Sequence, residues 1–202
     1  MTSDPIEVRA ASPGAWPDVE RVLGRGGSVR GCWCMWFRVG GAERRALWGE
    51  GNRRALREIV DSGPTPGLVA YRDGEPIGWC SVAPRSEFPV LARSPVARPI
   101  DDAPVWSLVC LYVVPEGRGL GVARQLVRAA CAHAAEGGAE TVEAYPVDDT
   151  MGPVAPDTAY HGVVTLLRSE GFAEVARRAP RRPLMRRDVR GLHSGAWTPA
   201  PE

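Results

Sequence analysis

The chain has 202 residues, of which 44% are hydrophobic and 24% are charged, and this composition suits one globular domain with a sizeable core. The formal net charge is +1, so no overall field draws the protein to nucleic acid or to a membrane surface. No apolar run approaches the roughly 20 residues needed to cross a bilayer, and the N-terminus lacks a secretion signal, so we expect a cytoplasmic protein. We expect a single domain over residues 1–190 and a loose tail over 191–202.

The first part of the chain predicts a strand, two helices and a hairpin. Ser12-Pro13 supplies an N-cap and a first-turn proline for the first helix. Asp73-Gly74, between two apolar runs, is a strong tight-turn signal. We expect strands at residues 6–10, 67–72 and 75–82, and helices at residues 13–23 and 42–61.

A proline-rich segment, residues 84–104, separates this hairpin from the rest of the chain and shows no periodicity. A loop of this length inside a compact domain is more often functional than idle. Strands and helices alternate after it. We expect strands at residues 105–114, 140–147, 172–177 and 184–189, and helices at residues 118–136 and 158–170.

The most informative motif is the glycine-rich turn Arg118–Ala123, which joins the apolar strand to a helix. Such a turn directs successive backbone N–H groups at one point where a helix also begins, and both features favour an anion. Glycine lets a phosphate approach the backbone closely. The turn lacks the Lys-Ser/Thr ending of a triphosphate loop, and its glycine spacing is not the dinucleotide fingerprint.

The strand and turn together resemble the core motif of the GCN5-related N-acetyltransferases (GNAT), in which Arg/Gln-x-x-Gly-x-Gly/Ala follows a strand ending in Leu-x-Val-x-Pro. The strand end is filled by Leu111, Val113 and Pro115, and the turn by Arg118, Gly121 and Ala123. The order of elements is also similar over residues 5–189. This resemblance implies an α/β fold with a mixed, mostly antiparallel sheet of about seven strands and four helices, splayed between strands 4 and 5.

By the same resemblance, the protein uses acetyl-coenzyme A to acetylate an amine of a small molecule by direct transfer. The acyl-pantetheine arm is expected to pair with the open strand edge, and the pyrophosphate to bind the glycine turn. No metal is expected. The implied cofactor-binding residues are Leu111, Tyr112, Val113, Arg118, Gly119, Leu120, Gly121, Val122 and Ala123.

Two positions depart from the familiar members of this family. The position of the Glu base used by some members is Ser107, and that of the Tyr acid used by many is Leu167. Either other groups take these roles, or catalysis relies on positioning, which can contribute several kcal/mol. Glu143 and Tyr145 lie two apart on one strand and so share a face, and an imidazole titrates near neutral pH. The candidates for catalysis are Glu143, Tyr145, Tyr160 and His161, each also open to a packing or surface role.

The segment Cys32–Arg38 lies between the first two helices, where this family builds its acceptor pocket. Three interpretations are open: an aromatic lid over the acceptor or pantetheine, plain core packing, or a metal or redox site using Cys32 and Cys34. We expect the pocket to include residues 84–104 and 143–149 and to take an acceptor with an apolar body. The candidates for substrate binding are Trp33, Trp36, Phe37 and Arg38, with Trp79 nearby.

Seven arginines cluster near the C-terminal end. They suit solvated edge strands or a patch for an anionic acceptor or RNA. Two alternative activities therefore stay open: a transferase acting on aminoacyl-tRNA or protein, and a catalytically silent acyl-coenzyme A-binding module. The edge strands also permit a homodimer. The cluster consists of Arg177, Arg178, Arg181, Arg182, Arg186, Arg187 and Arg190.

Overall fold

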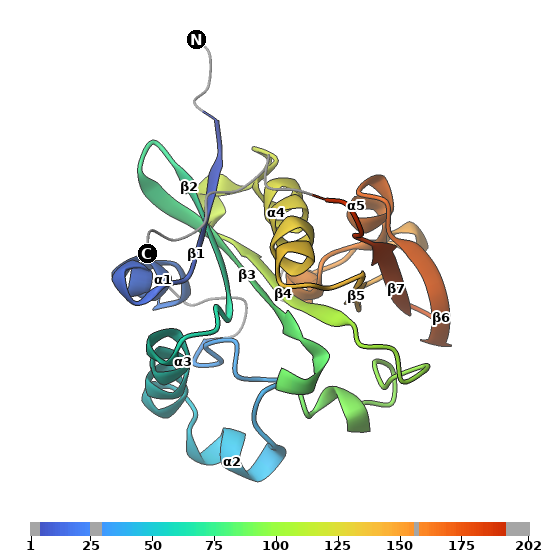
Figure 1. Ribbon diagram of the computed structural model, residues 1–202, viewed down its shortest axis with the longest axis horizontal. Coiled ribbons are helices and arrows are strands. Elements are labelled where there is room, and N and C mark those ends of the chain that lie inside the picture. Colours follow the sequence, from blue (N-terminus) through green and yellow to red (C-terminus); the bar gives the residue numbers. More distant parts are fainter. Residues whose placement is uncertain (1–4, 25–29, 156–157, 193–202) are drawn as a thin grey trace.

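The computed structural model describes residues 5–24, 30–155 and 158–192, and a seven-stranded sheet runs through it (Figure 1). The strand order is β1-β2-β3-β4-β5-β7-β6. The β4–β5 pair is parallel and every other neighbouring pair is antiparallel, which confirms the mixed, mostly antiparallel sheet. The strands are β1 (Glu7–Ala10), β2 (Gly67–Arg72), β3 (Glu75–Pro84), β4 (Trp106–Val113), β5 (Thr141–Ala144), β6 (Ala173–Ala179) and β7 (Arg182–Asp188).

Helices cover both faces of the sheet (Figure 1). On one face, α4 (Val122–Glu136) and α5 (Val164–Ser169) pack their apolar sides against β2, β3, β4 and β5. On the other, α1 (Trp16–Gly24) and α3 (Glu50–Ser62) pack around the fully buried Trp79. No helix in the described ranges is both long and apolar enough to cross a bilayer.

The long proline-rich segment is an ordered part of the core. Phe88, Leu91 and Ala97 pack against Val109 of β4 and Leu184 of β7. Two 3₁₀ turns, Arg85–Glu87 and Leu91–Arg93, give the segment its shape. The segment therefore forms a third layer beneath β4, β5 and β7.

Glycines with positive φ divide two of the expected helices. The helix expected over residues 42–61 is α2 (Gly41–Ala46) and α3, because Gly49 between them has a φ of 83°. The helix expected over 158–170 is a 3₁₀ turn, Ala159–His161, followed by α5, because Gly162 has a φ of 78°. A left-handed residue cannot continue a right-handed helix, so these two boundaries were predicted wrongly.

Two further boundaries also differ from expectation. The third helix begins at Val122 rather than at residue 118, because Gly119 and Gly121 have φ angles of 77° and 81°. Strand β5 ends at Ala144 instead of residue 147, shortly before Pro146, which has no N–H for a ladder. Residues 193–202 of the predicted tail lie outside the described residues. The same holds for residues 25–29 of the loop expected over residues 24–31.

Strands β4 and β5 stay together over only three residue pairs, Trp106–Val142, Ser107–Glu143 and Leu108–Ala144. The next residue, Val109, has no partner on β3 either, because Cys110 pairs with Ser81 while Leu108 pairs with Val82. Val109 is therefore the extra residue of a β-bulge, which bends the strand. From Val109 to Val113 the β5 side of β4 is open, and this confirms the expected splay.

Candidate functional site

A hollow lies at the end of β4, over the first turn of α4. It is lined by Val113, residues 117–119, residues 121–124 and Leu166. A Cβ atom added to Gly119 or Gly121 would meet no atom within 4 Å, so the space in front of both glycines is free. Since α4 has 15 residues, its unpaired N-terminal amides and dipole favour an anion in this space.

The side chains beside this hollow make contacts within the protein itself. Arg118 donates from Nε to the carbonyl oxygen of Val113, 3.3 Å away, and so fastens the turn to the end of β4. The Leu111 side chain packs on the α4 side of the sheet and the Tyr112 side chain on the α1 side. The side chains of these residues thus shape the fold, and their backbone is what a ligand could pair with.

A second hollow lies on the α1 side of β4, directly beside the open half of the strand. Its volume is about 140 Å³. Most of its wall is aromatic or aliphatic, and the 3₁₀ turn Ala159–His161 contacts β4 next to it. We call it the acceptor pocket, after the role that the sequence leads us to expect there. It is lined by Leu23, Cys32, Trp33, Cys34, Trp36, Phe37, Val109, Cys110, Tyr112 and Tyr160.

The segment Cys32–Phe37 reaches this pocket through an unusual backbone. Trp33 and Cys34 have φ angles of 48° and 55°, although neither is glycine. Such residues persist only where the surroundings hold them, and they cluster at functional sites. Two contacts hold them here: the Trp33 ring stacks on Trp16, with centroids 6.3 Å apart, and the indole N–H of Trp79 donates to Cys34 Sγ at 2.9 Å.

Three titratable side chains of the acceptor pocket have raised pKa values. Burial raises the pKa of Cys32 to about 11. A hydrogen bond with Cys34, together with burial, raises the pKa of Cys110, and burial raises that of Tyr160. These three groups therefore keep their protons. All five cysteines are free thiols, and the residues that the structure describes contain no group of three or more potential ligands able to hold a metal ion.

His161 sits behind the pocket wall and is only 5% exposed. Its ring lies 4.0 Å from the Tyr160 ring and 5.6 Å from the Phe37 ring, centroid to centroid. Burial, reinforced by the charge of Arg182, lowers its pKa to about 3, so the prediction that it titrates near neutral pH was wrong. One ring nitrogen donates to the backbone of Val109, while the buried Nδ1 has no hydrogen-bond partner among the described residues.

Arg38 lies outside the pocket lining, unlike Trp33, Trp36 and Phe37. Its guanidinium pairs with Glu87 at 2.7 Å and lies 4.6 Å from the centre of the Phe88 ring. It therefore ties the segment Cys32–Arg38 to the proline-rich segment. Neither residues 84–104 nor residues 143–149 contribute to the lining, because the first of these segments packs beneath the strands instead.

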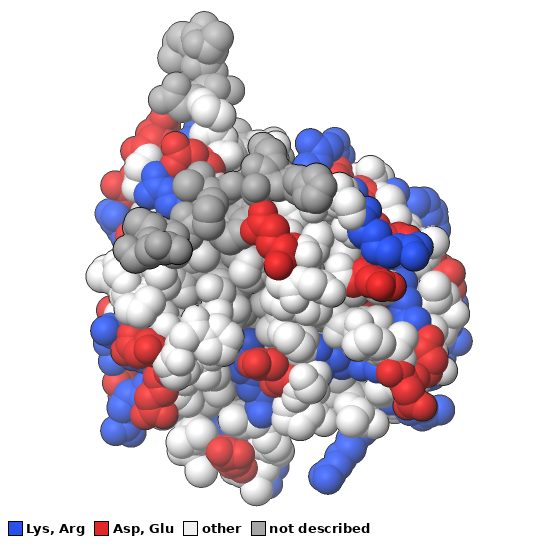
Figure 2. All heavy atoms as spheres, viewed as in Figure 1, with Lys and Arg blue, Asp and Glu red and all other residues white. Residues whose placement is uncertain are grey.

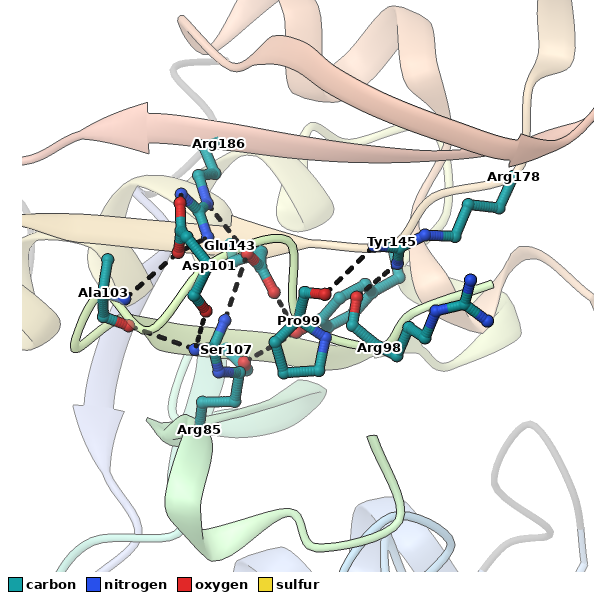
Figure 3. Close-up of polar contacts among 10 residues, drawn as sticks. All are labelled: Arg85, Arg98, Pro99, Asp101, Ala103, Ser107, Glu143, Tyr145, Arg178 and Arg186. Carbon is teal, nitrogen blue, oxygen red and sulfur yellow. Dashed lines mark hydrogen bonds and ion pairs between the residues drawn. The ribbon is translucent and has the colours of Figure 1, made fainter. Parts of the chain in front are cut away.

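Glu143 and Tyr145 do share one face of their strand, and they meet inside a buried polar network (Figure 3). Glu143 is completely buried; it accepts a hydrogen bond of 2.6 Å from the Tyr145 hydroxyl and pairs with Arg186 at 2.8 Å. Arg85 lies 3.6 Å from the same carboxylate. The Tyr145 hydroxyl also lies 2.9 Å from Ser107 Oγ. These groups face one another rather than the acceptor pocket.

The network also holds residues 98–103 of the proline-rich segment (Figure 3). Arg186 donates hydrogen bonds to both carboxylate oxygens of Asp101, at 2.6 and 2.8 Å, and lowers the pKa of that carboxyl to about 2. Arg85 donates to the carbonyl oxygens of Asp101 and Ala103, and Arg178 to that of Pro99 at 3.0 Å. The arrangement fastens a loop to the sheet.

Sequence reasoning named Glu143 among the substitutes for the family's Glu, but it missed that Glu143 lies beside Ser107. In the parallel ladder Ser107 pairs with Glu143, so the carboxylate lies one strand away from that position. No spacing in the sequence signals this pairing, because it depends on the register between the two strands. Leu167, at the position of the family's Tyr, is completely buried in the core between α4 and the sheet.

The clustered arginines are largely paired within the molecule. Arg177 pairs with Glu174 and Asp148, and Arg190 pairs with Asp188. Arg181 donates to the carbonyl oxygens of Asp148, Gly152 and Pro153. Basic and acidic side chains alternate on the face seen in Figure 2. The cluster thus resembles a charged sheet edge more than a basic patch.

Comparison with known proteins identifies the family. A sequence model of the acetyltransferase (GNAT) family matches residues 33–152, which include the aromatic segment, β4 and the glycine turn. The chain belongs to the GNAT family of acetyltransferases. It is accordingly an acyltransferase of the N-acetyltransferase type. No curated protein matches the sequence.

Solved structures with this fold are numerous. One is an acetyltransferase with a TM-score of 0.56 and 16% identity, over 90% of this chain and 98% of that one. Another is the PaiA N-acetyltransferase of Thermoplasma acidophilum in complex with coenzyme A, with a TM-score of 0.52, 14% identity, and coverage of 92% and 99%. A third is the histone acetyltransferase HPA2 and related acetyltransferase of Corynebacterium glutamicum, with a TM-score of 0.52, 17% identity, and coverage of 92% and 97%. At these identities the likeness shows the fold alone.

Proposed function

We propose that this GNAT protein transfers an acetyl group from acetyl-coenzyme A to the amine of a small molecule. One observation carries the proposal: the two hollows border the same open half of β4. The glycine-turn hollow includes Val113, and the acceptor pocket includes Val109, Cys110 and Tyr112. A donor bound along this strand segment would present its acyl group beside the acceptor pocket.

The donor side would be held mainly by backbone groups. Amides of Gly119, Leu120, Gly121, Val122 and Ala123 would bind the pyrophosphate, as the free space at Gly119 and Gly121 allows. The Arg118 amide donates to the Pro115 carbonyl oxygen instead. The strand backbone of Leu111, Tyr112 and Val113 would pair with the pantetheine arm, since β5 has already ended.

When bound, the thioester supplies an acyl carbon that an amine can attack. Tyr160 would give a proton to the departing sulfur, because it lines the pocket and its turn contacts β4, along which the donor would lie. His161 would position Tyr160 and Val109 through its ring contact and its hydrogen bond. Glu143 and Tyr145 are placed to support the strand, although a direct part for either stays untested.

Calorimetric titration with acetyl-coenzyme A tests the donor site, using Gly121→Trp and a matched control. Gly121 and Gly138 have nearly the same φ, 81° and 83°, and both face open space, but Gly138 follows the far end of α4. Both substitutions introduce similar backbone strain. We expect the wild type and Gly138→Trp to bind the donor and Gly121→Trp to lose binding. A folded wild-type protein that does not bind acetyl-coenzyme A would refute the proposal.

One alternative keeps a specific observation in its favour. Ser107 and Leu167 occupy the family's two catalytic positions, which suits a protein that binds acyl-coenzyme A without turning it over. Release of free coenzyme A in the presence of a broad amine panel separates the two activities. Steady release dependent on an amine supports the transferase, and tight donor binding without release supports the silent module.

A further inference from the structure

The size of the acceptor pocket indicates the size of its occupant. The pocket measures about 140 Å³. An engineered apolar cavity of about 150 Å³ in another protein binds benzene, so a space of this size holds one six-membered ring. The ring faces of Trp33, Trp36 and Phe37 can pack on such a ring. The pocket is too small for a peptide or an oligosaccharide to be enclosed in it.

The lining also selects the charge of the occupant. None of the lining residues within the described ranges carries a carboxylate. The ionisable lining groups are the thiols of Cys32, Cys34 and Cys110 and the hydroxyls of Tyr112 and Tyr160. An ammonium ion entering this pocket would lose its hydration without gaining an anionic partner, and that cost favours its neutral form.

Positive charges lie against the pocket lining. The Arg44 guanidinium lies 3.8 Å from the centre of the Trp36 ring. Arg182, from β7, interacts electrostatically with Tyr160 of the lining and with His161 behind it. It donates to the Tyr145 carbonyl oxygen at 3.2 Å, and its buried Nε has no hydrogen-bond partner among the described residues. A cation in this position further disfavours an ammonium ion in the pocket.

We propose that the acceptor is a single-ring, weakly basic amine of the arylamine class, bound as the free base in the pocket formed by Trp33, Trp36 and Phe37. This inference rests on the proposed acetyl transfer to an amine. An arylamine is already unprotonated at neutral pH, so no carboxylate is needed to expose its lone pair. The new nitrogen–carbon bond forms as the carbon–sulfur bond breaks, and the electron pair of the broken bond goes to sulfur. Tyr160 gives its hydroxyl proton to this sulfur, and the resulting tyrosinate takes up the proton that nitrogen releases, which restores Tyr160.

The test is calorimetric titration of the coenzyme A-bound protein with aniline and with benzylamine between pH 6 and pH 9. Cys32 and His161 keep one protonation state in this interval, since the pKa of Cys32 is about 11 and that of His161 about 3. A pH dependence that benzylamine shows and aniline does not therefore reports the ligand. We expect aniline to bind equally well throughout, and benzylamine to tighten about tenfold per pH unit as its free base accumulates.

Benzylamine that binds at pH 6 as tightly as aniline would overturn the inference, and so would a pocket that takes neither amine while coenzyme A binds. Loss of coenzyme A binding itself would instead count against the proposed function.

Trp36→Ala should abolish aniline binding, whereas Trp48→Ala should not. The two tryptophans are similarly exposed, at 36% and 42%, but Trp48 lies outside the pocket. Arg182→Met should improve binding of the benzylammonium form about tenfold and leave aniline unchanged.

Discussion

The two halves of β4 face very different surroundings. The first half, Trp106–Leu108, pairs with β5 and borders the charged network around Glu143. Arg85 Nη1 in this network has no hydrogen bond among the described residues, but it lies 3.6 Å from the Glu143 carboxylate and so faces an opposite charge. The second half, Val109–Val113, does not pair with β5 and borders the acceptor pocket, whose lining contains no carboxylate among the described residues. Beside it, His161 Nδ1 and Arg182 Nε have no hydrogen-bond partner in the described part of the chain.

This contrast separates scaffold from site. Buried polar groups are normally hydrogen-bonded, so a satisfied network needs no ligand, whereas partnerless groups beside a hollow call for an explanation. The non-glycine residues with positive φ support the same division, because Trp33 and Cys34 line the pocket and the network has none. Titratable residues in a strand are therefore a poor guide to chemistry until their partners are known.

Replacing Glu143 with Gln should have the largest effect on the scaffold half. The substitution removes the buried anion that Arg186 and Arg85 face, and breaking a buried pair costs about 3 kcal/mol or more. Urea unfolding would measure this loss. Asp101→Asn, at the exposed end of the same network, should lower stability much less, because exposed ion pairs contribute little. A Glu143→Gln protein of unchanged stability that has lost turnover would identify Glu143 as catalytic.

Tyr160→Phe should have a comparable but slightly smaller effect, and on the site half. Loss of a proton donor lowers kcat about 100-fold, while the affinity for acetyl-coenzyme A stays unchanged. Tyr145→Phe is the matched control, since its hydroxyl contacts only Glu143 and Ser107 in the described structure. It should lower stability by about 1 kcal/mol and leave kcat nearly intact. Equal kcat values for both variants and the wild type would remove Tyr160 from the mechanism.

The donor side was more predictable from sequence than the acceptor side. The glycine turn is a contiguous segment whose function depends on the backbone, so Gly119, Gly121 and the strand before them identified both fold and family. The acceptor pocket combines residues from Leu23 to Tyr160. Its aromatic members were recognised because three large rings are unusual between two helices.

Other features depend on geometry that no pattern encodes. Cys110 and Tyr112 face the pocket only because the bulge at Val109 shifts the alternation of β4. Arg38 lies next to Phe37 in the chain, yet it turns toward Glu87 of the proline-rich segment. The four helix and strand boundaries that differ from expectation follow left-handed glycines and Pro146, whose effects depend on local φ angles and hydrogen bonds.

The smallest expected effect is a pH dependence of stability that His161 confers on the site half. Its pKa is about 3 in the folded protein and 6.5 in the ordinary imidazole, so the unfolded chain binds the proton more tightly. Stability is thus complete above pH 6.5 and falls by up to about 1.4 kcal/mol per pH unit as the pH decreases toward 3. Asp101 and Asp188, whose pKa values are lowered to about 2, add acid sensitivity that a His161 variant shares.

Chemical unfolding of the wild type and of His161→Phe at pH 7 and pH 5 isolates the contribution of the histidine. The difference in unfolding free energy between the two proteins should shift in favour of the variant at pH 5. An unchanged difference would mean that His161 is solvated, and the acceptor pocket would then be wetter and more polar than its lining indicates.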